Sequence, residues 1–377
     1  MIALRDRGYR DRATGAQVWQ VTEGPAINHP TYFLQSSFFP GGREMFFTSY
    51  RTGSAQLFEA ALDSALDSGI DSGLDSGTPR QITSGEAIHP FSAALHPDGE
   101  TLVFTRGGGL WAIHRHTLAQ RCIADHAGAQ LGECSISRDG EWLTAAFKSG
   151  AQSGLVAGRF DGSGWHTIPF PRTVIHPQFH PLEPDWIEFA GDPAPRMHRV
   201  RRDGNGLECL YQHGNDEFLV HETFLGDSGD LVFTVWPRAL RRMDWTTREI
   251  RTIVEYNAWH IAPDRRGRRV LCDTNHPDEG LQIIDAATGA RRQLCLSESS
   301  NQGTQWRHSR YALAEDFAQA RNALSWMESA ADTVYGPQWS HPHPSWSTDE
   351  TKVAFASDRT GTAQVYVVEV SASETAC

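Results

Sequence analysis

Two histidines separated by one residue form the most chemically suggestive pattern of this sequence. They lie in the segment Gln338-Trp339-Ser340-His341-Pro342-His343-Pro344. Because proline disfavours helix in the residue before it, this segment should be extended, and residues two apart in an extended segment point to the same side. Two imidazoles and the Gln338 amide then form half of a cage for a metal ion. Two partly buried histidines that hydrogen-bond to the backbone are the alternative for such a short pattern.

Further histidines precede strand-like segments elsewhere in the chain. A single histidine at such a position more often caps a strand end, but imidazoles that converge without acids are typical of a metal or proton-transfer site. These histidines occur in the pairs and triplets His29-Pro30, His89-Pro90, His176-Pro177, His221-Glu222 and Asn275-His276-Pro277.

A repeated unit must position these histidines. The first copy has a β-rich run, a Pro/Gly turn and a second β-rich run over 36–49, and the last copy has the same pattern over 344–357. The two copies continue alike, as Arg51-Thr52-Gly53 and Arg359-Thr360-Gly361. This similarity between the two ends of the chain indicates internal repetition of a β-rich unit.

Five more copies of the unit lie between these two. They are marked by the turns at 96–99, 137–140, 180–185, 227–230 and 262–267. Seven units of roughly forty residues predict an all-β fold, a seven-bladed β-propeller. We expect the Pro/Asp/Gly turns to connect strands two and three of each blade, and the strand-like stretch 17–21 to close the ring.

We predict that 1–377 is a single propeller domain with two interruptions. The stretch 62–78 repeats Asp, Ser, Gly and Leu, which indicates a low-complexity surface loop. The stretch 294–337 is an insertion before the last unit, helix-like over 311–327. Because it directly precedes Gln338, we expect this partly helical insertion to lie over the mouth of the channel.

Composition limits the classes of partner. The apolar content of 39% is sufficient for a large core, and the net charge of −12 argues against a nucleic-acid partner. The six cysteines have no CxxC spacing, which is typical of thiols in a reducing compartment. No apolar run is long enough to cross a membrane, and the start lacks the apolar core of a secretory signal. We therefore expect a cytoplasmic protein; the oligomeric state stays open.

The C-terminal motif resembles the metal site of the oligogalacturonate lyases. Gln338-x-x-His341-x-His343, with His276 in the preceding unit, is similar to the three histidines and one glutamine with which these seven-bladed propellers bind manganese. The resemblance implies that Mn²⁺, or another divalent transition metal, binds to His276, Gln338, His341 and His343.

The resemblance extends upstream of these ligands. Arg196-Met197-His198 is similar to the Arg-x-Trp segment of the family, with His198 in place of the tryptophan. His221-Glu222-Thr223-Phe224 matches the start of its His-Glu-Phe-Trp motif and departs from it at the last two residues. The resemblance implies that Arg196 neutralises a substrate carboxylate and that His221 is the catalytic base.

Four further residues are candidates for contacting substrate. Trp259 and Trp339 can stack on sugar rings, although tryptophan in propellers more often packs between blades. His176 belongs to the repeated histidines, and Arg51 is a cation near a blade end. The duplication of Arg51 in the last unit favours a structural role for it.

The resemblance implies a carbon–oxygen lyase of pectin degradation that cleaves short oligogalacturonates, small acidic oligosaccharides, by β-elimination. Three neutral imidazoles and an amide leave a metal ion its full charge, and mixed nitrogen and oxygen ligation favours Mn²⁺ over Ca²⁺. Two alternatives remain. One is a non-catalytic binding propeller of the TolB type, which predicts that the histidines do not converge; the other is a lyase, epimerase or hydrolase for a different acidic sugar.

Overall fold

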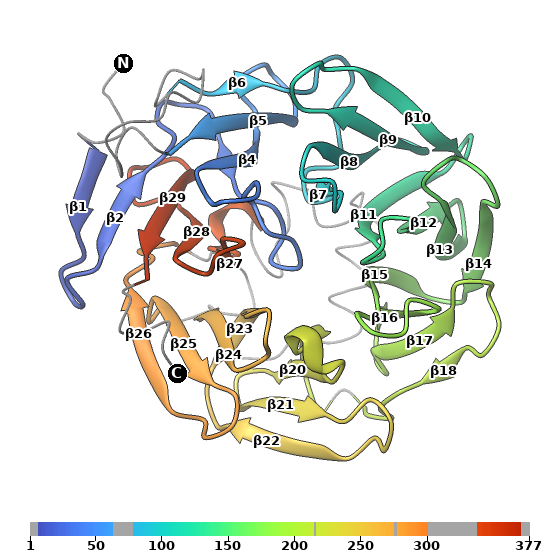
Figure 1. Cartoon of the computed structure of the whole chain (residues 1–377). Helices are drawn as coiled ribbons and strands as arrows, with labels where there is room; N and C mark the ends of the chain where they lie inside the picture. Colours follow the sequence, from blue (N-terminus) through green and yellow to red (C-terminus); the bar gives the residue numbers. More distant parts are fainter. Residues whose placement is uncertain (1–6, 63–77, 215, 275–276, 301–337, 371–377) are drawn as a thin grey trace.

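Seven antiparallel sheets surround a central axis, which confirms the predicted all-β seven-bladed propeller (Figure 1). The computed structural model describes residues 7–62, 78–214, 216–274, 277–300 and 338–370. In six of the sheets the strands follow in chain order from the axis outward, because short turns join antiparallel neighbours. Figure 1 shows the first strands of the blades, such as β7, β11 and β15, on the inside of the ring.

The first three blades have four strands each. Their bounds are β3 (Asn28–His29), β4 (Glu44–Ser49), β5 (Gln56–Ala61) and β6 (Arg80–Gln81); β7 (Ala94–Leu95), β8 (Thr101–Arg106), β9 (Gly109–His114) and β10 (Gln120–Asp125); and β11 (Gln130–Ile136), β12 (Trp142–Ser149), β13 (Gln152–Arg159) and β14 (His166–Phe170).

The next three blades repeat this arrangement. Their bounds are β15 (Thr173–Phe179), β16 (Trp186–Asp192), β17 (Met197–Arg201) and β18 (Glu208–Cys209); β19 (Leu219–Phe224), β20 (Leu231–Val235), β21 (Ala239–Met243) and β22 (Ile250–Val254), with the 3-10 helix η2 (Gly226–Ser228) between β19 and β20; and β23 (Ala258–Pro263), β24 (Arg269–Thr274), β25 (Leu281–Asp285) and β26 (Arg291–Cys295).

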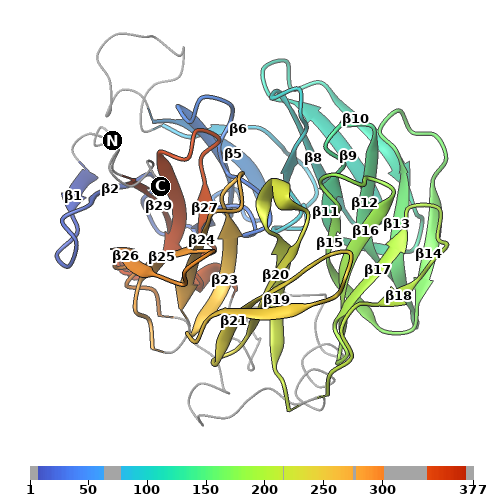
Figure 2. The same ribbon diagram turned by 60° about the horizontal axis from the view of Figure 1, so that its bottom comes forward.

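Blade seven joins the two ends of the chain and closes the ring. After the 3-10 helix η3 (Gln338–Ser340) it contains β27 (Ser345–Trp346), β28 (Lys352–Ser357) and β29 (Gln364–Glu369), followed outward by β2 (Gln17–Gln20) and β1 (Gly8–Arg10). Figure 2 shows β1 and β2 on the outside of this blade. The predicted closing strand is therefore confirmed as β2, whose Val18 pairs with Val368, while β1 was not predicted.

The Pro/Asp/Gly turns connect strands one and two, and the prediction that they connect strands two and three was wrong. The turn at 96–99 joins β7 to β8, and the turn at 137–140 joins β11 to β12. The apolar run before each turn is itself the end of the innermost strand: the N–H groups of His96 and Ser137 donate across the hairpin to Thr101 and Trp142. The turn at Arg51-Thr52-Gly53 joins β4 to β5, so the two kinds of turn lie at opposite ends of the blades.

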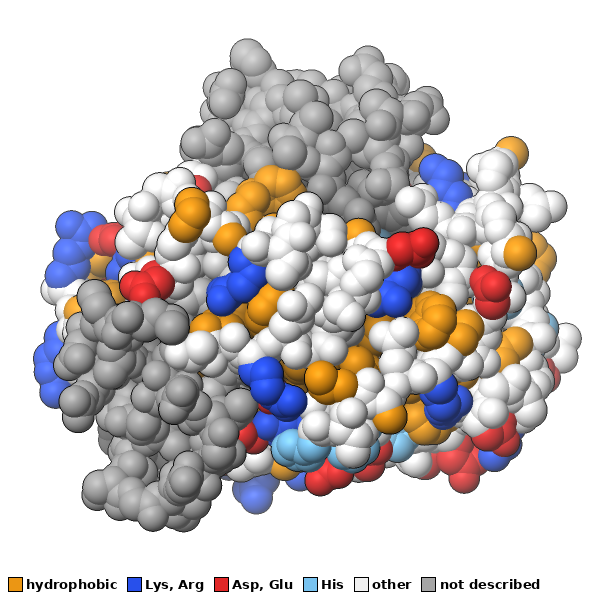
Figure 3. All heavy atoms as spheres, turned by 90° about the horizontal axis from the view of Figure 1, so that it is seen from above, with side chains coloured by type: hydrophobic (Ala, Val, Ile, Leu, Met, Phe, Trp, Pro, Cys, Tyr) orange, Lys and Arg blue, Asp and Glu red, His pale blue; other side chains and the backbone are white. Residues whose placement is uncertain are grey.

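Apolar side chains fill the spaces between neighbouring blades. Phe38, Phe47 and Phe58 of blade one pack with Val365 and Val367 of blade seven, all at most 3% exposed. Each blade buries both faces, so its central strands are apolar on both sides. Basic and acidic side chains are interspersed over the outer side of the ring seen in Figure 3.

Several predictions fall on residues outside the described part of the chain. These are the low-complexity loop, of which 63–77 are not described, and the helical insertion, of which 301–337 are not described. Leu294 and Cys295, expected in the insertion, belong to strand β26. Among the described residues, no helix has the length and hydrophobicity that crossing a bilayer requires.

Candidate metal and proton-transfer site

The innermost strands of blades three to six each contain a β-bulge at the same place. The pairing register with strand two shifts between Leu131 and Cys134, Ile175 and Gln178, Leu219 and Glu222, and Ala258 and Ile261. A bulge inserts an extra residue, bends the strand and redirects a side chain. These irregularities therefore set which side chains the blades present to the axis.

Equivalent positions in five successive blades carry ionisable residues. Each lies four residues before the position whose N–H closes the hairpin to strand two, namely Ser137, His180, Leu225, Asp264 and Ser347. All are buried, with at most 6% of their surface exposed. The residues are Glu133, His176, His221, His260 and His343.

Three of the buried histidines form a cluster that can hold a metal ion. His260, His341 and His343 each offer a nitrogen, and these three atoms lie within 4.8 Å of one another. The Nε2 atom of His260 and both ring nitrogens of His343 are buried without a hydrogen-bond partner among the described residues. Leaving buried imidazole nitrogens unpaired is costly unless a ligand satisfies them, so the cluster fits a metal.

A carboxylate behind the cluster orients His260. The Nδ1–H of His260 donates to Asp273 Oδ2 at 2.8 Å, which leaves Nε2 as the atom available to an ion. A hydrogen bond of this kind behind a metal-binding histidine fixes its tautomer and ring orientation. Burial lowers the pKa of His260 and His343 well below 6.5, so both rings are neutral, as metal ligation requires.

The structure brings two of the four predicted metal ligands together, and it places beside them a third histidine that was not predicted. His341 and His343 lie together, and His260 from strand β23 joins them. His276 lies outside the described residues. Gln338 begins the helix η3 immediately before His341, but its side chain is not described. The roles of His276 and Gln338 therefore stay predictions.

His221, the predicted base, lies beside this cluster. Its ring is 4.4 Å from the ring of His260 and packs edge-on against Trp259 and Phe33 at 4.8 and 5.0 Å. Its Nδ1 is buried without a hydrogen-bond partner among the described residues. Burial and the nearby histidines lower the pKa of His221 well below 6.5. A neutral imidazole with an unengaged nitrogen is able to accept a proton.

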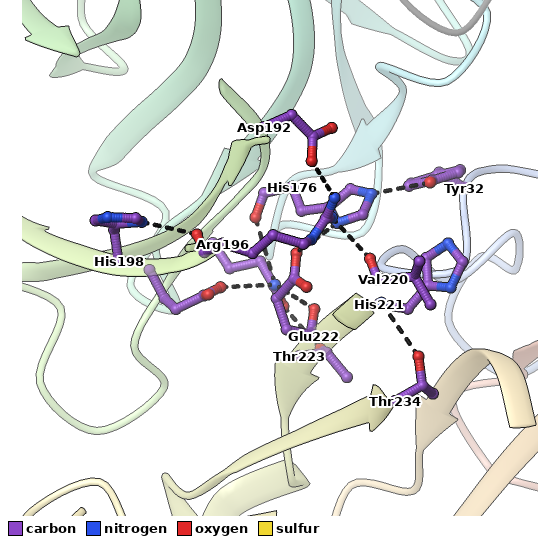
Figure 4. Close-up of polar contacts among 12 residues, drawn as sticks. Tyr32, His176, Asp192, Arg196, His198, Val220, His221, Glu222, Thr223 and Thr234 are labelled. Carbon is purple, nitrogen blue, oxygen red and sulfur yellow. Dashed lines mark hydrogen bonds and ion pairs between the residues drawn. The ribbon is translucent and has the colours of Figure 1, made fainter. Parts of the chain in front are cut away.

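Arg196 lies in a buried network of ion pairs (Figure 4). Its guanidinium contacts the carboxylate of Asp192, donates to the backbone oxygen of Val220 at 2.7 Å and lies 3.4 Å from Glu222 Oε1. The loop after β16 thus points this side chain toward β19, the strand that carries His221. Arg196 belongs to the same site as the predicted base, and its role as a carboxylate clamp stays a prediction.

His198, which stands where the family pattern has tryptophan, forms hydrogen bonds with two arginines. Its Nδ1–H donates to the backbone oxygen of Arg196 at 2.7 Å, and its Nε2 accepts from Arg172 at 3.2 Å. Burial lowers its pKa, in agreement with a neutral ring that can play both roles. Thr223, the other departure, donates to Gln178 at 2.7 Å and faces away from His221.

The predicted substrate-binding residues lie in different surroundings. Trp259 is only 2% exposed and packs among Trp236 and the histidines, whereas Trp339 is partly exposed and lines a surface pocket. Arg51 is exposed, but its guanidinium donates to Ser49 and Asn28 of its own blade. Their roles toward substrate stay predictions. His176 has both ring nitrogens bonded within the protein, as described below.

Buried histidines outside the cluster make stability depend on pH. Burial lowers the pKa of His29 to about 4, against 6.5 for an exposed histidine. Between these values the unfolded chain binds a proton that the folded chain does not, so the free energy of unfolding decreases as pH falls from 6.5 to 4, by up to about 3 kcal/mol. We expect His29→Gln to reduce the loss of Tm between pH 7 and pH 4.5; an unchanged loss would contradict this assignment.

The chain is similar in sequence to two known lyases and in structure to a solved lyase. No profile of a known protein family matches it. It is 22% identical to an oligogalacturonide lyase of Pectobacterium atrosepticum, over 98% of this chain and 97% of that protein. It is 21% identical to an oligogalacturonate lyase of Dickeya dadantii, over 96% and 95%. A solved structure of an oligogalacturonate lyase in complex with manganese superposes with a TM-score of 0.77 at 18% identity, over 98% and 96% of the two chains.

Proposed function

Since this chain belongs to the oligogalacturonate lyase family, we propose that it is a metal-dependent carbon–oxygen lyase that cleaves short oligogalacturonates by β-elimination. The observation that carries this proposal is the position of His221 directly beside the cluster of His260, His341 and His343. A base next to a metal site is what removal of a proton alpha to a carboxylate requires.

The residues of this chain divide the reaction between them. The proton at C5 of a uronate is weakly acidic because the adjacent carboxylate is charged. Arg196 neutralises that carboxylate, and a guanidinium can do so with two parallel hydrogen bonds. His221 accepts the C5 proton, the electron pair forms the C4–C5 double bond, and the bond from C4 to the glycosidic oxygen breaks. The products are a shortened oligosaccharide and an unsaturated uronate.

His260, His341 and His343 would hold the metal ion, with Gln338 or His276 as further candidates. When bound, the ion supplies positive charge that stabilises the carboxylate as negative charge develops on it. Neutral imidazole ligands favour a transition metal over Ca²⁺, which prefers oxygen. We propose Mn²⁺, the ion named for the solved oligogalacturonate lyase.

Ultraviolet absorbance of the unsaturated product tests the proposal. The protein is incubated with digalacturonate and trigalacturonate, with Mn²⁺, with a chelator, and as the His221→Ala variant. We expect an increase in absorbance that the chelator abolishes and that the substitution slows by at least about 100-fold. Metal binding without any increase would reject this substrate and favour a different acidic sugar. Absence of both metal binding and the increase would favour a non-catalytic propeller of the TolB type.

The convergence of the histidines speaks against that non-catalytic alternative. A non-catalytic binding propeller predicted no such convergence, yet three buried imidazoles lie close together.

The described cysteines bear on the location of the protein. Cys122, Cys134, Cys209, Cys272 and Cys295 all carry free thiols, which supports the proposal of a reducing cytoplasm.

A further inference from the structure

A series of buried hydrogen bonds links Arg196 through Glu222 and His176 to Tyr32 (Figure 4). The hydroxyl of Tyr32 lies 2.9 Å from His176 Nε2, and His176 Nδ1 lies 2.7 Å from Glu222 Oε1. The same oxygen of Glu222 lies 3.4 Å from Arg196 Nη2. All four side chains are at most 5% exposed. The network is therefore shielded from water, where such bonds are strongest.

His176 is one of the two inner members of this hydrogen-bonded series, and its position is tightly constrained. Its Nδ1–H donates to the carboxylate and its Nε2 accepts from the tyrosine hydroxyl, so neither nitrogen remains for a ligand. Its backbone adopts φ of 57°, in the left-handed region, directly before Pro177 and within the bulge of β15. A non-glycine residue keeps this conformation only where the surroundings impose it, and such residues concentrate at functional sites.

Glu222 transmits the position of His176 to Arg196. The guanidinium is held from three sides, by Asp192, by the backbone of Val220 and by Glu222. Glu222 is 0% exposed, so its carboxylate depends on its protein partners to keep one orientation. Without His176 the Glu222 carboxylate loses its shortest hydrogen bond, and the side of the guanidinium that it contacts loses its fixed partner.

At the other end of this hydrogen-bonded series, Tyr32 contacts the three-histidine cluster. The ring of Tyr32 packs against the ring of His343 at 5.1 Å and against that of His260 at 6.1 Å. Phe33, the next residue, contacts His221 and His176 at 5.0 and 5.5 Å. The loop after β3 therefore places two aromatic rings between the blades that carry the cluster and the blade that carries Arg196.

We propose that His176 is a positioning residue, which with Glu222 and Tyr32 sets the orientation of Arg196 relative to the three-histidine cluster. This replaces the expectation that His176 itself contacts substrate. The inference rests on the proposed function for the identity of the substrate. It also explains why a glutamate follows the predicted base, since Glu222 bonds to both His176 and Arg196.

A comparison of single variants with a double variant tests the proposal. Digalacturonate cleavage by the metal-loaded protein is measured for His176→Gln, Glu222→Gln, Arg196→Lys and the double variant Arg196→Lys/His176→Gln. A misplaced binding group costs on the order of 100-fold, so we expect kcat/KM to fall about 10- to 100-fold in His176→Gln. The double variant should be no more than about threefold worse than Arg196→Lys, because coupled residues are not additive. Additive losses would overturn the proposal.

His180→Gln is the matched control. His180 is also buried, at 2% exposed. Its Nε2 bonds to the backbone oxygen of Gly229, which is not part of the hydrogen-bonded series that ends at Arg196. We expect this variant to retain wild-type kcat/KM at a temperature well below its Tm. If His180→Gln loses as much activity as His176→Gln, the loss reflects packing of buried histidines, and the positioning role of His176 is rejected.

A binding measurement separates failure of this inference from failure of the proposed function. If the wild type does not cleave digalacturonate, the proposed reaction is wrong. Affinity for the galacturonate anion is then measured by calorimetry on the same metal-loaded variants. His176→Gln should weaken it in the wild-type background and leave it unchanged in the Arg196→Lys background. Equal weakening in both backgrounds would overturn the positioning role.

Discussion

Replacing His221 by alanine is expected to lower kcat for digalacturonate cleavage by about 100- to 10,000-fold, the usual contribution of a general base. The reason is that Nδ1 of His221 is buried, without a hydrogen-bond partner among the described residues, and that the His221 ring lies beside the three-histidine cluster. KM should change little, because the proton is transferred only as the reaction proceeds. Initial rates of unsaturated product formation measure the effect.

Metal binding by the same variant decides between two roles. The ring of His221 lies only 4.4 Å from that of His260, close enough that a ligand role has to be tested. We expect His221→Ala to bind Mn²⁺ with the stoichiometry and affinity of the wild type. If the metal is lost together with activity, His221 is a ligand, and the base must be another group.

Replacing His260 by alanine is expected to weaken Mn²⁺ binding by at least about 100-fold, since loss of even an outer partner of a ligand costs 10- to 100-fold. The reason is that His260 completes the three-nitrogen cluster and that Asp273 orients its ring toward the other two. Calorimetric titration with Mn²⁺ measures the affinity, and cleavage of digalacturonate should fall in parallel.

His276→Ala is the matched comparison, because resemblance to the family pointed to that residue. The structure brings His260 to His341 and His343, so we expect the larger loss of affinity from His260→Ala. Full metal binding by His260→Ala together with loss in His276→Ala would show that His260 is a structural neighbour and that the third ligand is His276.

Local patterns in the sequence were sufficient for the fold. The repeated turns and strands indicated seven blades, and the strand-like residues around Val18 indicated how the ring closes, because hairpins and strand propensity are local properties. The placement of the turns within a blade was wrong for a related reason. A short innermost strand such as β7 (Ala94–Leu95) is difficult to recognise, so the strands were counted from the wrong one.

The site was predicted in part, and His260 shows why. It has neither a following proline nor a second histidine two residues away, so the local pattern around it indicates no metal site. A signal was nevertheless present. His176, His221, His260 and His343 all lie four residues before the start of the turn to strand two. Alignment of the repeats on their turns, which were recognised, would have placed His260 with the other histidines.

The partners of Arg196 illustrate what sequence spacing does not contain. Its contacts with Val220 and Glu222 join blade four to blade five across more than twenty residues. Which buried carboxylates approach a guanidinium depends on the β-bulges at Ile175–Gln178 and Leu219–Glu222, which redirect side chains of the innermost strands. Only the assembled ring specifies this electrostatic arrangement.

The pairing of β2 with β29 makes the site dependent on both ends of the chain. His341 and His343 precede the innermost strand of the blade whose outer strands come from the N-terminal segment. His341 and His343 are synthesised after the other histidines of the site, and the strands that complete their blade, β1 and β2, are synthesised before all of them. A chain that ends before blade seven therefore lacks two of the three clustered histidines, so the three-histidine cluster is complete only after blade seven has been synthesised.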